Sequence, residues 1–504
     1  MCLAGGKRSD TSRNLMPIPR TRLLQEVEVQ ALDPARFEPL IGVERMRRFE
    51  AIAESTRVAL GDRSVLNINS TAVGGGVAEM LQTLLAYARG AGVDARWLVI
   101  EGSKDFFAIT KRIHNGLYGT SGDGGGLGQR ERDEYEHVAR SNADALRAVL
   151  APGDVVLLHD PQTAGLAPLV ARAGALVVWR CHVGRDEPNE WTERSWDFLR
   201  PYLEDVDGLV FSRQAFAPSW ADPAKTSVVA PSIDPFSAKN EPMSDRNVRL
   251  ALGYVGLLEG DGSPPVIPFR RRDGSPGRIT RRVDVVQTGP PPPADAPFVL
   301  QASRWDAMKD MSGVMEGFAY SVDHALGAHL VLAGPAVTGV ADDPEAAAVY
   351  EDCLKRWRAL PHALRSRVHL ACTPMADPDE AAAIVNALQR HAAVVVQKSF
   401  AEGFGLTVAE GMWKSRPVVG TAVGGIADQI TSGEHGLLVD DPADLEGFGA
   451  GVERLLRDPE EAETLGRNGR RRATEEFLGD RHLAQYATVL ARLLDGHSQL
   501  AGEP

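Results

Sequence analysis

AAVVVQKSFAEGFGLTVAEGMWKSRPVVGT, residues 392–421, is the stretch that decides the fold. It reads as a buried β-branched strand, a loop containing Gly403 and Gly405, a helix that begins at Leu406, and a second strand over 416–421. A short apolar strand followed by a glycine loop, a helix and another strand is the repeating unit of a parallel sheet covered by helices. Ligands bind beyond the carboxyl ends of the strands in such sheets, so the glycine loop marks a candidate site.

The same alternation of strands and helical patterns runs through the rest of the chain, in two halves. The expected strands are 63–70, 95–102, 154–160, 175–182 and 208–213 in the first half, and 297–304, 329–335, 366–373, 392–399 and 416–421 in the second. We therefore expect an α/β protein of two doubly wound, Rossmann-like domains that face each other across a cleft. The amphipathic segment 480–494 is expected to be a helix that crosses back to the first domain.

The alternation stops between about residues 238 and 297, where Pro, Gly and Arg are abundant. Four consecutive prolines, Pro290 to Pro293, cannot lie inside a helix or a central strand, so this stretch is predicted to be linker. The arginine-rich run 270–282 is interpreted as a solvated loop face, with an anion site as the alternative. The predicted division is a flexible tail (1–22), a first domain (23–285), a linker (286–297), a second domain (298–478), and a C-terminal helix and tail (479–504).

Composition excludes several classes of function. A chain of 504 residues with 43% hydrophobic and 24% charged residues is long enough for about two or three globular domains. Fifty-five Lys and Arg against 68 Asp and Glu give a net charge of −13, which argues against nucleic acid as a partner. The four cysteines are widely spaced and read as reduced thiols. No apolar run approaches the ~18 residues needed to span a bilayer, and the basic N-terminus lacks the apolar core of a secretory signal. We expect a cytoplasmic protein without a membrane partner.

The junction of loop and helix at 400–411 carries the strongest chemical signal. A helix beginning at Leu406 leaves free backbone N–H groups at its positive end, which suits a diphosphate. Glu410, about a turn further on, could accept hydrogen bonds from ribose hydroxyls, and Glu402 from sugar hydroxyls. The alternative is that both glutamates are surface charges.

Two further features follow strands at the expected edge of each sheet. Arg304 and Lys309 come after the first strand of the second half, where two cations would neutralise a leaving diphosphate. The alternative for this pair is a solvated loop. Gly74, Gly75 and Gly76 separate a strand from a helix in the first half, and without side chains they allow backbone amides to approach an anion or a sugar. A tight turn explains them equally well.

Polar residues also follow two strands of the first half. His159, Asp160, His182 and Asp186 would supply hydrogen-bonding groups where a second substrate meets the donor. A histidine at such a position is more often a structural hydrogen-bonding residue. These side chains lack metal-ligand spacing, so no metal is assigned to them.

The glycine loop framed by Glu402 and Glu410, with RPVVGTAVGGIADQITSGEHGLLV (416–439) after it, closely resembles the retaining glycosyltransferases of family 4, which have the GT-B fold. Within that family the likeness is to the glycosyltransferring trehalose synthases. It rests on LNINSTAVGGGVAEML (66–81), ARWLVIEG (95–102), FFAITKRIHNGLYG (106–119), LLHDPQ (157–162) and QASRWDAMKD (301–310), among others. The resemblance runs from about residue 23 to 495 and is weakest at 238–297 and 119–128.

This resemblance implies a reaction: NDP-glucose (ADP-, UDP- or GDP-glucose) and free glucose give α,α-trehalose and NDP, reversibly, by same-face transfer with retention. It also implies a homodimer. No permanently bound cofactor is expected, and Mg²⁺ could enter with the diphosphate. One alternative is a related enzyme with another small acceptor, namely a sugar phosphate, fructose or glycerate. A phosphorylated acceptor would need a cationic pocket, for which Lys104, Lys111, Arg112 and Arg185 are the candidates. Another alternative is a non-catalytic sugar or nucleotide sensor.

The resemblance also implies roles for individual residues. Arg304 and Lys309 would hold the leaving diphosphate, Glu402 the donor glucose hydroxyls, and Glu410 the ribose. His182 would lie near the transferred sugar. Backbone and side-chain groups of Gly334, Gly403, Phe404, Gly405, Leu406 and Thr407 would bind the rest of the donor. Asp160 and the loop of Gly74, Gly75 and Gly76 would lie beside the acceptor.

Overall fold

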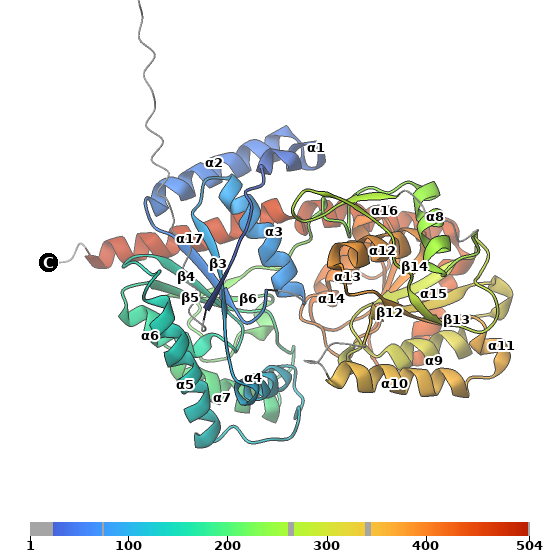
Figure 1. Ribbon diagram of the computed structural model, residues 1–504, viewed down its shortest axis with the longest axis horizontal. Helices are drawn as coiled ribbons and strands as arrows, with labels where there is room; N and C mark the ends of the chain where they lie inside the picture. The colour runs from blue at the N-terminus through green and yellow to red at the C-terminus, as the bar shows by residue number, and fades with distance from the viewer. Residues whose placement is uncertain (1–23, 73–74, 261–266, 338–343, 502–504) are drawn as a thin grey trace, which may run out of the picture.

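Buried apolar runs form the centres of two seven-stranded sheets, one in each half of the chain (Figure 1). The computed structural model describes residues 24–72, 75–260, 267–337 and 344–501. In spatial order the first sheet consists of β1 (Leu24–Val27), β3 (Ala95–Ile100), β2 (Val65–Asn69), β4 (Val155–His159), β5 (Leu176–Cys181), β6 (Gly208–Phe211) and β7 (Thr226–Val228). The second consists of β10 (Asp284–Val286), β13 (Val368–Thr373), β12 (His329–Pro335), β11 (Phe298–Ala302), β14 (Ala392–Gln397), β15 (Val418–Thr421) and β16 (Leu437–Val439).

The two sheets have the same plan. An antiparallel strand lies at one edge, β1 against β3 in the first sheet and β10 against β13 in the second, and the remaining neighbours are parallel. The central strands are buried on both faces, which is why they read as continuous apolar runs rather than alternating ones. Two doubly wound α/β domains were predicted from the sequence, and this is confirmed.

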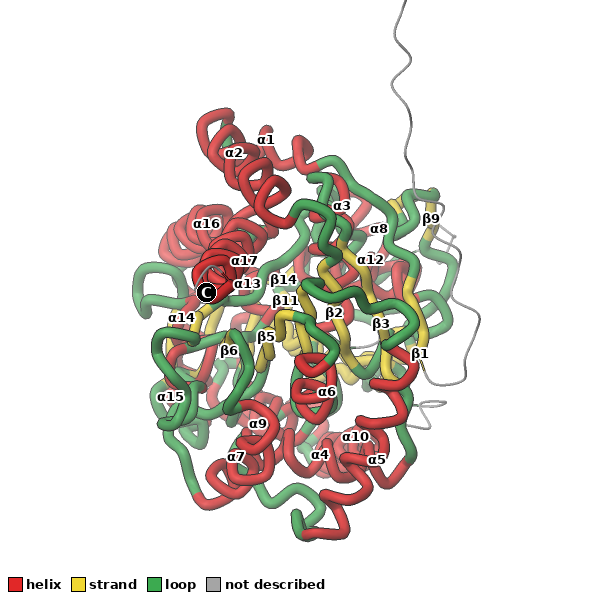
Figure 2. The backbone as a smooth tube through the Cα atoms, turned by 90° about the vertical axis from the view of Figure 1, so that its left-hand side faces the viewer, coloured by secondary structure: helices red, strands yellow, loops and turns green. Residues whose placement is uncertain are grey.

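Helices cover both faces of the first sheet. Figure 2 shows its strands between α2 and α3 on one side and α4, α5, α6 and α7 on the other. Leu66, Leu158 and Trp179 face the second group of helices, while Val65 and Leu157 alternate to the opposite face. The helices of this domain are α1 (Glu38–Ile41), α2 (Val43–Leu60), α3 (Gly76–Gly90), α4 (Lys104–Leu117), α5 (Gln129–Leu146), α6 (Ala167–Arg172) and α7 (Glu190–Leu203).

The second domain is also a three-layer arrangement. Its helices are α8 (Asp245–Val255), α9 (Met311–Ser321), α10 (Pro344–Ala359), α11 (His362–Arg365), α12 (Pro378–His391), α13 (Leu406–Trp413), α14 (Gly424–Gln429), α15 (Leu445–Arg457) and α16 (Pro459–Glu476). One face of the sheet packs against α9, α10 and α15, and the other against α8, α12 and α13. Among the described residues, no helix is both long enough and apolar enough to cross a membrane.

The C-terminal helix α17 (Gly479–Ala501) leaves the second domain and runs along the first, as expected from the sequence (Figure 1). Val489, Leu490 and Leu494 pack onto the first sheet together with Val155 and Val178. With this helix the chain crosses between the domains for a second time, next to the β-bridge between Ile233 and Leu478.

The prediction that residues 238–297 are linker is wrong for much of this segment. Residues 245–255 form α8, which packs on α12, and β8 (Pro268–Arg270) and β9 (Pro276–Arg278) form a hairpin. Since α8 packs on α12 and β10 pairs with β13, the segment from residue 245 already belongs to the second domain, before the boundary predicted at residue 285. The prolines at 290–293 do lie outside helices and strands. The predicted flexible tail, 1–22, lies outside the described residues.

The strand order places the ends of four strands at the two switch points of the sheets. In the first sheet, consecutive strands extend outward from the boundary between β2 and β4, and in the second from the boundary between β11 and β14. Loops that leave such strands diverge to opposite faces and open a crevice between them. The candidate residues follow these four strands or β5, the neighbour of β4, except for Gly334, which lies near the end of β12, the neighbour of β11.

Candidate active site

Residues from both domains line one cleft of about 620 Å³. From the first domain come Gly75, Gly76, Asp160 and His182; from the second come Arg304, Lys309, Gly334, Glu402, Gly403, Phe404, Gly405, Leu406, Thr407 and Glu410. The structure thus brings together the residues to which the resemblance assigns roles, as far as it describes them, whereas Asp186 is absent from this lining and pairs with Arg213 instead. Gly74 lies outside the described residues.

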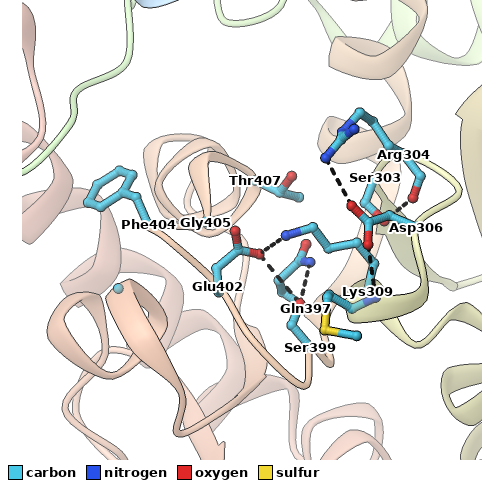
Figure 3. Close-up of polar contacts among 12 residues, drawn as sticks. Ser303, Arg304, Asp306, Lys309, Gln397, Ser399, Glu402, Phe404, Gly405 and Thr407 are labelled. Atoms are coloured by element: carbon cyan, nitrogen blue, oxygen red, sulfur yellow. Dashed lines mark hydrogen bonds and ion pairs between the residues drawn. The ribbon is translucent and has the colours of Figure 1, made fainter. Parts of the chain in front are cut away.

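The two predicted cations lie in the loop that follows β11 (Figure 3). Lys309 Nζ is 2.6 Å from Glu402 Oε2, and Arg304 Nη2 is 2.9 Å from Asp306 Oδ2. Burial acts to raise the pKa of Asp306, but Arg304 and Lys309 outweigh it and hold the pKa below its usual value. The loop carrying the cations is tied to the loop carrying Glu402 by the Phe400 N–H, which donates to the Met308 carbonyl at 2.8 Å. The backbone contact between the two loops therefore fixes both cations beside the carboxylates of Glu402 and Asp306.

The amino end of α13 borders the same wall. Gly405 precedes the helix with φ +87°, a conformation that glycine adopts at little cost. No side chain caps this end of the helix, so its N–H groups are left facing the cleft region. Thr407 Oγ1 donates to the Ala302 carbonyl at 3.0 Å and fixes the helix against β11. An anion can be bound here by backbone donors and by the cations of the neighbouring loop together.

Glu410 is buried in a network that joins the domains. Gln389 Nε2 donates to its Oε2 at 2.9 Å, and Lys239 Nζ is 3.4 Å from its Oε1. Lys239 also lies 2.9 Å from Glu79 on α3 of the first domain. Burial acts to lower the pKa of Lys239, but Glu410 and Glu79 hold it above its ordinary value, so the ammonium is retained. Lys239 lies in the stretch taken for linker, which is why the sequence reading missed it.

Asp160 and His182 form the opposite wall. Asp160 has φ +64° and its Oδ1 accepts a hydrogen bond from the His182 backbone N–H at 2.8 Å. Burial raises the pKa of Asp160 to about 7, although that hydrogen bond and Arg180 act in the other direction. His159 Nδ1 is 3.1 Å from His182 Nε2. The sequence placed His159 near the site, and the structure shows that it contacts His182.

The walls approach each other closely at two glycines. A Cβ atom on Gly403 would lie 2.6 Å from the His182 carbonyl oxygen, and one on Gly76 would lie 3.0 Å from Leu406 Cδ1. Each of these contacts joins the two domains. The absence of a side chain at both glycines therefore lets the domains lie close together. Tyr118 also reaches Gly403 and lines the cleft; it lies in the stretch 106–119 but was given no role.

Phe404 and Gly334, which were predicted to bind the donor, also take part in the packing of the second domain. The ring of Phe404 packs edge-on against Phe477 with centroids 5.6 Å apart, and Figure 3 shows it away from the charged cluster. Gly334 leaves room for the indole of Trp305, whose Nε1 would be 2.6 Å from a Cβ at that position. Their contribution to a ligand site would therefore come from the backbone or from the edge of the ring.

Within the ranges that the structure describes, no group of three or more His, Cys, Asp and Glu side chains is arranged to hold a metal ion. The polar side chains of the cleft include cations, carboxylates and histidines, together with uncharged Ser, Thr, Asn, Gln and Tyr side chains.

Comparisons with known proteins identify both halves. Residues 67–218 match the family "Trehalose synthase, N-terminal domain", and residues 289–472 match "Glycosyl transferases group 1". The trehalose synthase of Pyrococcus horikoshii is 32% identical over 91% of this chain and 95% of its own. That of Rubrobacter xylanophilus is 34% identical over 85% of this chain and 90% of its own.

A solved structure shows the same architecture. The α,α-trehalose-phosphate synthase (UDP-forming) from Burkholderia vietnamiensis superposes with a TM-score of 0.62 at 14% identity, covering 88% of this chain and 99% of its own. At that identity the likeness shows the fold, which is GT-B. The chain belongs to the trehalose synthase family of the group 1 glycosyl transferases and is a glycosyltransferase.

Proposed function

We propose that the protein transfers glucose from a nucleoside-diphosphate glucose to free glucose and so forms α,α-trehalose with retention at the transferred carbon. The observation that carries this proposal is the arrangement of the cleft. Arg304, Lys309 and the amino end of α13 share one wall with Glu402, and His182 and Asp160 lie on the other. A diphosphate is met by positive charge on one side, while the sugar lies between hydroxyl-binding groups.

The chemistry follows from which groups are present. The bond between the glucose C1 and the leaving phosphate oxygen breaks, a bond from C1 to an acceptor hydroxyl oxygen forms on the same face, and the leaving phosphate takes the hydroxyl proton. Arg304 and Lys309 stabilise the negative charge that develops on the diphosphate. Glu402 is held at 2.6 Å by Lys309 through Oε2, which leaves Oε1 to accept from donor hydroxyls. The side chains on both walls fix the two sugars in the orientation for attack.

The charges of the first domain favour an unphosphorylated acceptor. Arg112 is paired with Asp123 through both Nε and Nη2, at 2.5 and 2.8 Å, and Arg185 Nε donates to the Glu187 carbonyl at 2.7 Å. Lys111 borders the cleft but lies 3.6 Å from Glu345 of the second domain. Three of the four candidate cations for a phosphate pocket, Lys111, Arg112 and Arg185, thus already interact with groups of the protein.

We further propose that Mg²⁺, where it takes part, enters with the nucleotide and is bound through the phosphate oxygens. The cleft offers the cations Arg304 and Lys309 to the same diphosphate, so the ion and the side chains would share its charge. We propose that the preference among ADP, UDP and GDP is set at the carboxyl ends of β12 and β13, where Gly334 and Thr373 border the cleft.

The test is a matrix of donors and acceptors. The purified protein is incubated with ADP-, UDP- or GDP-glucose and with glucose, glucose 6-phosphate, fructose or glycerate, and released NDP and new disaccharide are measured by chromatography. We expect NDP release coupled to a disaccharide with glucose only. Faster turnover with glucose 6-phosphate or another acceptor would replace the proposed acceptor. Tight nucleotide binding without turnover for any pair would indicate a sensor instead.

A further inference from the structure

Three buried polar side chains form a chain of hydrogen bonds in the first domain, and two of them, His159 and His182, line the cleft. Asn67 lies on β2, His159 ends β4, and His182 directly follows β5; they are 4%, 2% and 8% exposed. His159 lies in the middle: its Nε2 is 3.1 Å from Asn67 Oδ1 and its Nδ1 is 3.1 Å from His182 Nε2. Their position follows from the sheet, because β2 pairs with β4 and β4 with β5.

Neither imidazole is charged near neutral pH. Burial, with Arg180 acting in the same direction, lowers the pKa of His159 to about 3. Burial also lowers the pKa of His182 far below its ordinary value, and Arg180 and His159 add to the effect. A neutral imidazole has one N–H and one lone pair, so each ring in the chain donates at one nitrogen and accepts at the other.

The direction of the chain is set at Asn67. Its Oδ1 can only accept, so His159 Nε2–H donates to it and His159 Nδ1 carries the lone pair. That lone pair accepts from His182 Nε2–H. His182 Nδ1 is then a lone pair, and it has no hydrogen bond to another residue in the described parts of the chain.

The backbone of His182 is fixed separately. Its N–H donates to Asp160 Oδ1 at 2.8 Å, so the main chain and the ring are held by different partners. His182 borders the cleft, and its remaining ring nitrogen can accept from a hydroxyl but cannot donate to one.

We propose that His159, oriented by Asn67, is a positioning residue that holds His182 in the Nε2–H form and so presents an acceptor nitrogen to a hydroxyl of the transferred glucose. The identity of the sugar rests on the proposed function, whereas the proton arrangement is a property of the free protein. His159 acts through His182.

The proton arrangement is tested on the free full-length protein labelled with ¹⁵N-histidine. Ring ¹⁵N shifts at pH 7.5, assigned with the His159→Asn and His182→Asn variants, distinguish protonated from unprotonated nitrogens. We expect both rings to carry the proton on Nε2. A proton on Nδ1 of either ring would overturn the proposal, because it would reverse or break the chain.

The kinetic test compares His159→Phe with His159→Asn. Phenylalanine keeps a ring of similar size but cannot accept from His182, so we expect kcat/KM to fall about 10- to 100-fold and the His182 signals to show a mixture of both tautomers. Asparagine can place its oxygen near the position of Nδ1. We therefore expect the kcat/KM of His159→Asn to be at least about 10-fold higher than that of His159→Phe. His137→Asn, at an exposed position on α5, is the control and should match the wild type.

Equal activity of the Phe and Asn variants, at any level, would contradict the proposal. If His159→Phe fails to fold, the ¹⁵N measurement on the wild type still decides it. The two proposals fail separately: the expected tautomers without trehalose formation would refute only the proposed function, and trehalose formation with the opposite tautomers would refute only the role of His159.

Discussion

At the scale of single residues, the cleft concentrates opposite charges in fixed pairs. Lys309 and Glu402 are 14% and 10% exposed in their side chains, so both are largely removed from water and their charges act at short range. In the proposed reaction, the diphosphate of the donor meets an ammonium that the protein has already placed. An ammonium fixed in this way stabilises the negative charge of the departing diphosphate more than it stabilises the bound donor.

Lys309→Ala tests this placement. We expect kcat to fall about 10²- to 10³-fold while KM for the donor changes by less than about 10-fold, because the cation acts mainly on charge that develops as the bond breaks. Steady-state kinetics with the preferred NDP-glucose measures both. Lys355→Ala, an exposed lysine on α10, serves as control. Near-wild-type turnover of Lys309→Ala would show that the proposed mechanism is wrong.

Asp160 gives a prediction of pH dependence. Its folded-state pKa of about 7 lies above the ~3.9 of an unfolded aspartate, so between these values the unfolded chain is ionised while the folded protein keeps the proton. The Asp160 carboxyl therefore lowers the free energy of unfolding by an amount that grows as pH rises from about 4 to 7. Asp160→Asn cannot ionise and also tolerates φ +64°.

We expect the stability advantage of Asp160→Asn over the wild type to be about 2 kcal/mol larger at pH 8 than at pH 5.5. Urea unfolding of both proteins at the two pH values measures this difference. An advantage that is the same at both values, or larger at pH 5.5, would show that Asp160 is not held protonated by burial.

At the scale of elements, the arginine-rich hairpin region has a structural task. Glu380, in the first turn of α12, is fully buried and accepts from the backbone N–H groups of Thr280 and Arg281 at 2.5 and 2.6 Å. The guanidinium of Arg281 also contacts it. Arg271 and Arg272 pair with Asp377 and Asp379 at the same end of α12. The run is thus a partly solvated face, as expected for Arg272 and Arg281 with 42% and 43% exposure, but its arginines are also tied to α12 by ion pairs.

Glu380→Ala would leave two backbone donors and an arginine without their shared acceptor. We expect a loss of about 3 kcal/mol in the free energy of unfolding, measured by urea denaturation. Glu351→Ala, at an exposed position on α10, is the control and should stay within about 0.5 kcal/mol of the wild type. A Glu380→Ala protein as stable as that control would mean that the contacts to α12 contribute little.

The hairpin also shows where sequence reasoning stops. Buried strands such as 392–399 were predictable because their apolar runs are local signals. Strands β8, β9 and β10 have three residues each, lie among Pro, Gly and Arg, and depend on partners far away in the chain. The glycine loop, Arg304, Lys309 and Glu402 were found by motif, whereas Lys239 and the role of His159 required the packing of separate elements.

At the scale of the whole molecule, the domains are held together near the site by charges as well as by glycine contacts. Arg213 of the first domain bridges Asp186, at 2.5 Å, and Asp428 of the second domain, at 2.7 Å. Asp186 Oδ2 also accepts from the Gly424 N–H at 3.1 Å, across the same boundary. Removing Arg213 would leave two carboxylates facing each other.

Arg213→Ala should therefore weaken the closed arrangement. We expect KM for the donor to rise about 3- to 10-fold, equivalent to about 1 kcal/mol, with a larger radius of gyration by small-angle scattering. Arg200→Ala breaks an exposed ion pair within the first domain and is the matched control. If the two variants behaved alike, the bridge would have no part in closure.

The central claim concerns the whole cleft: that it moves glucose onto free glucose with retention. The most direct measurement is NMR of the product formed from the preferred donor labelled with ¹³C at C1 of its glucose, with unlabelled glucose as acceptor. We predict that the labelled carbon appears at the α-anomeric position of α,α-trehalose as soon as the donor is consumed. Label in a β-linked product, in free glucose only, or in a sugar other than trehalose would contradict it.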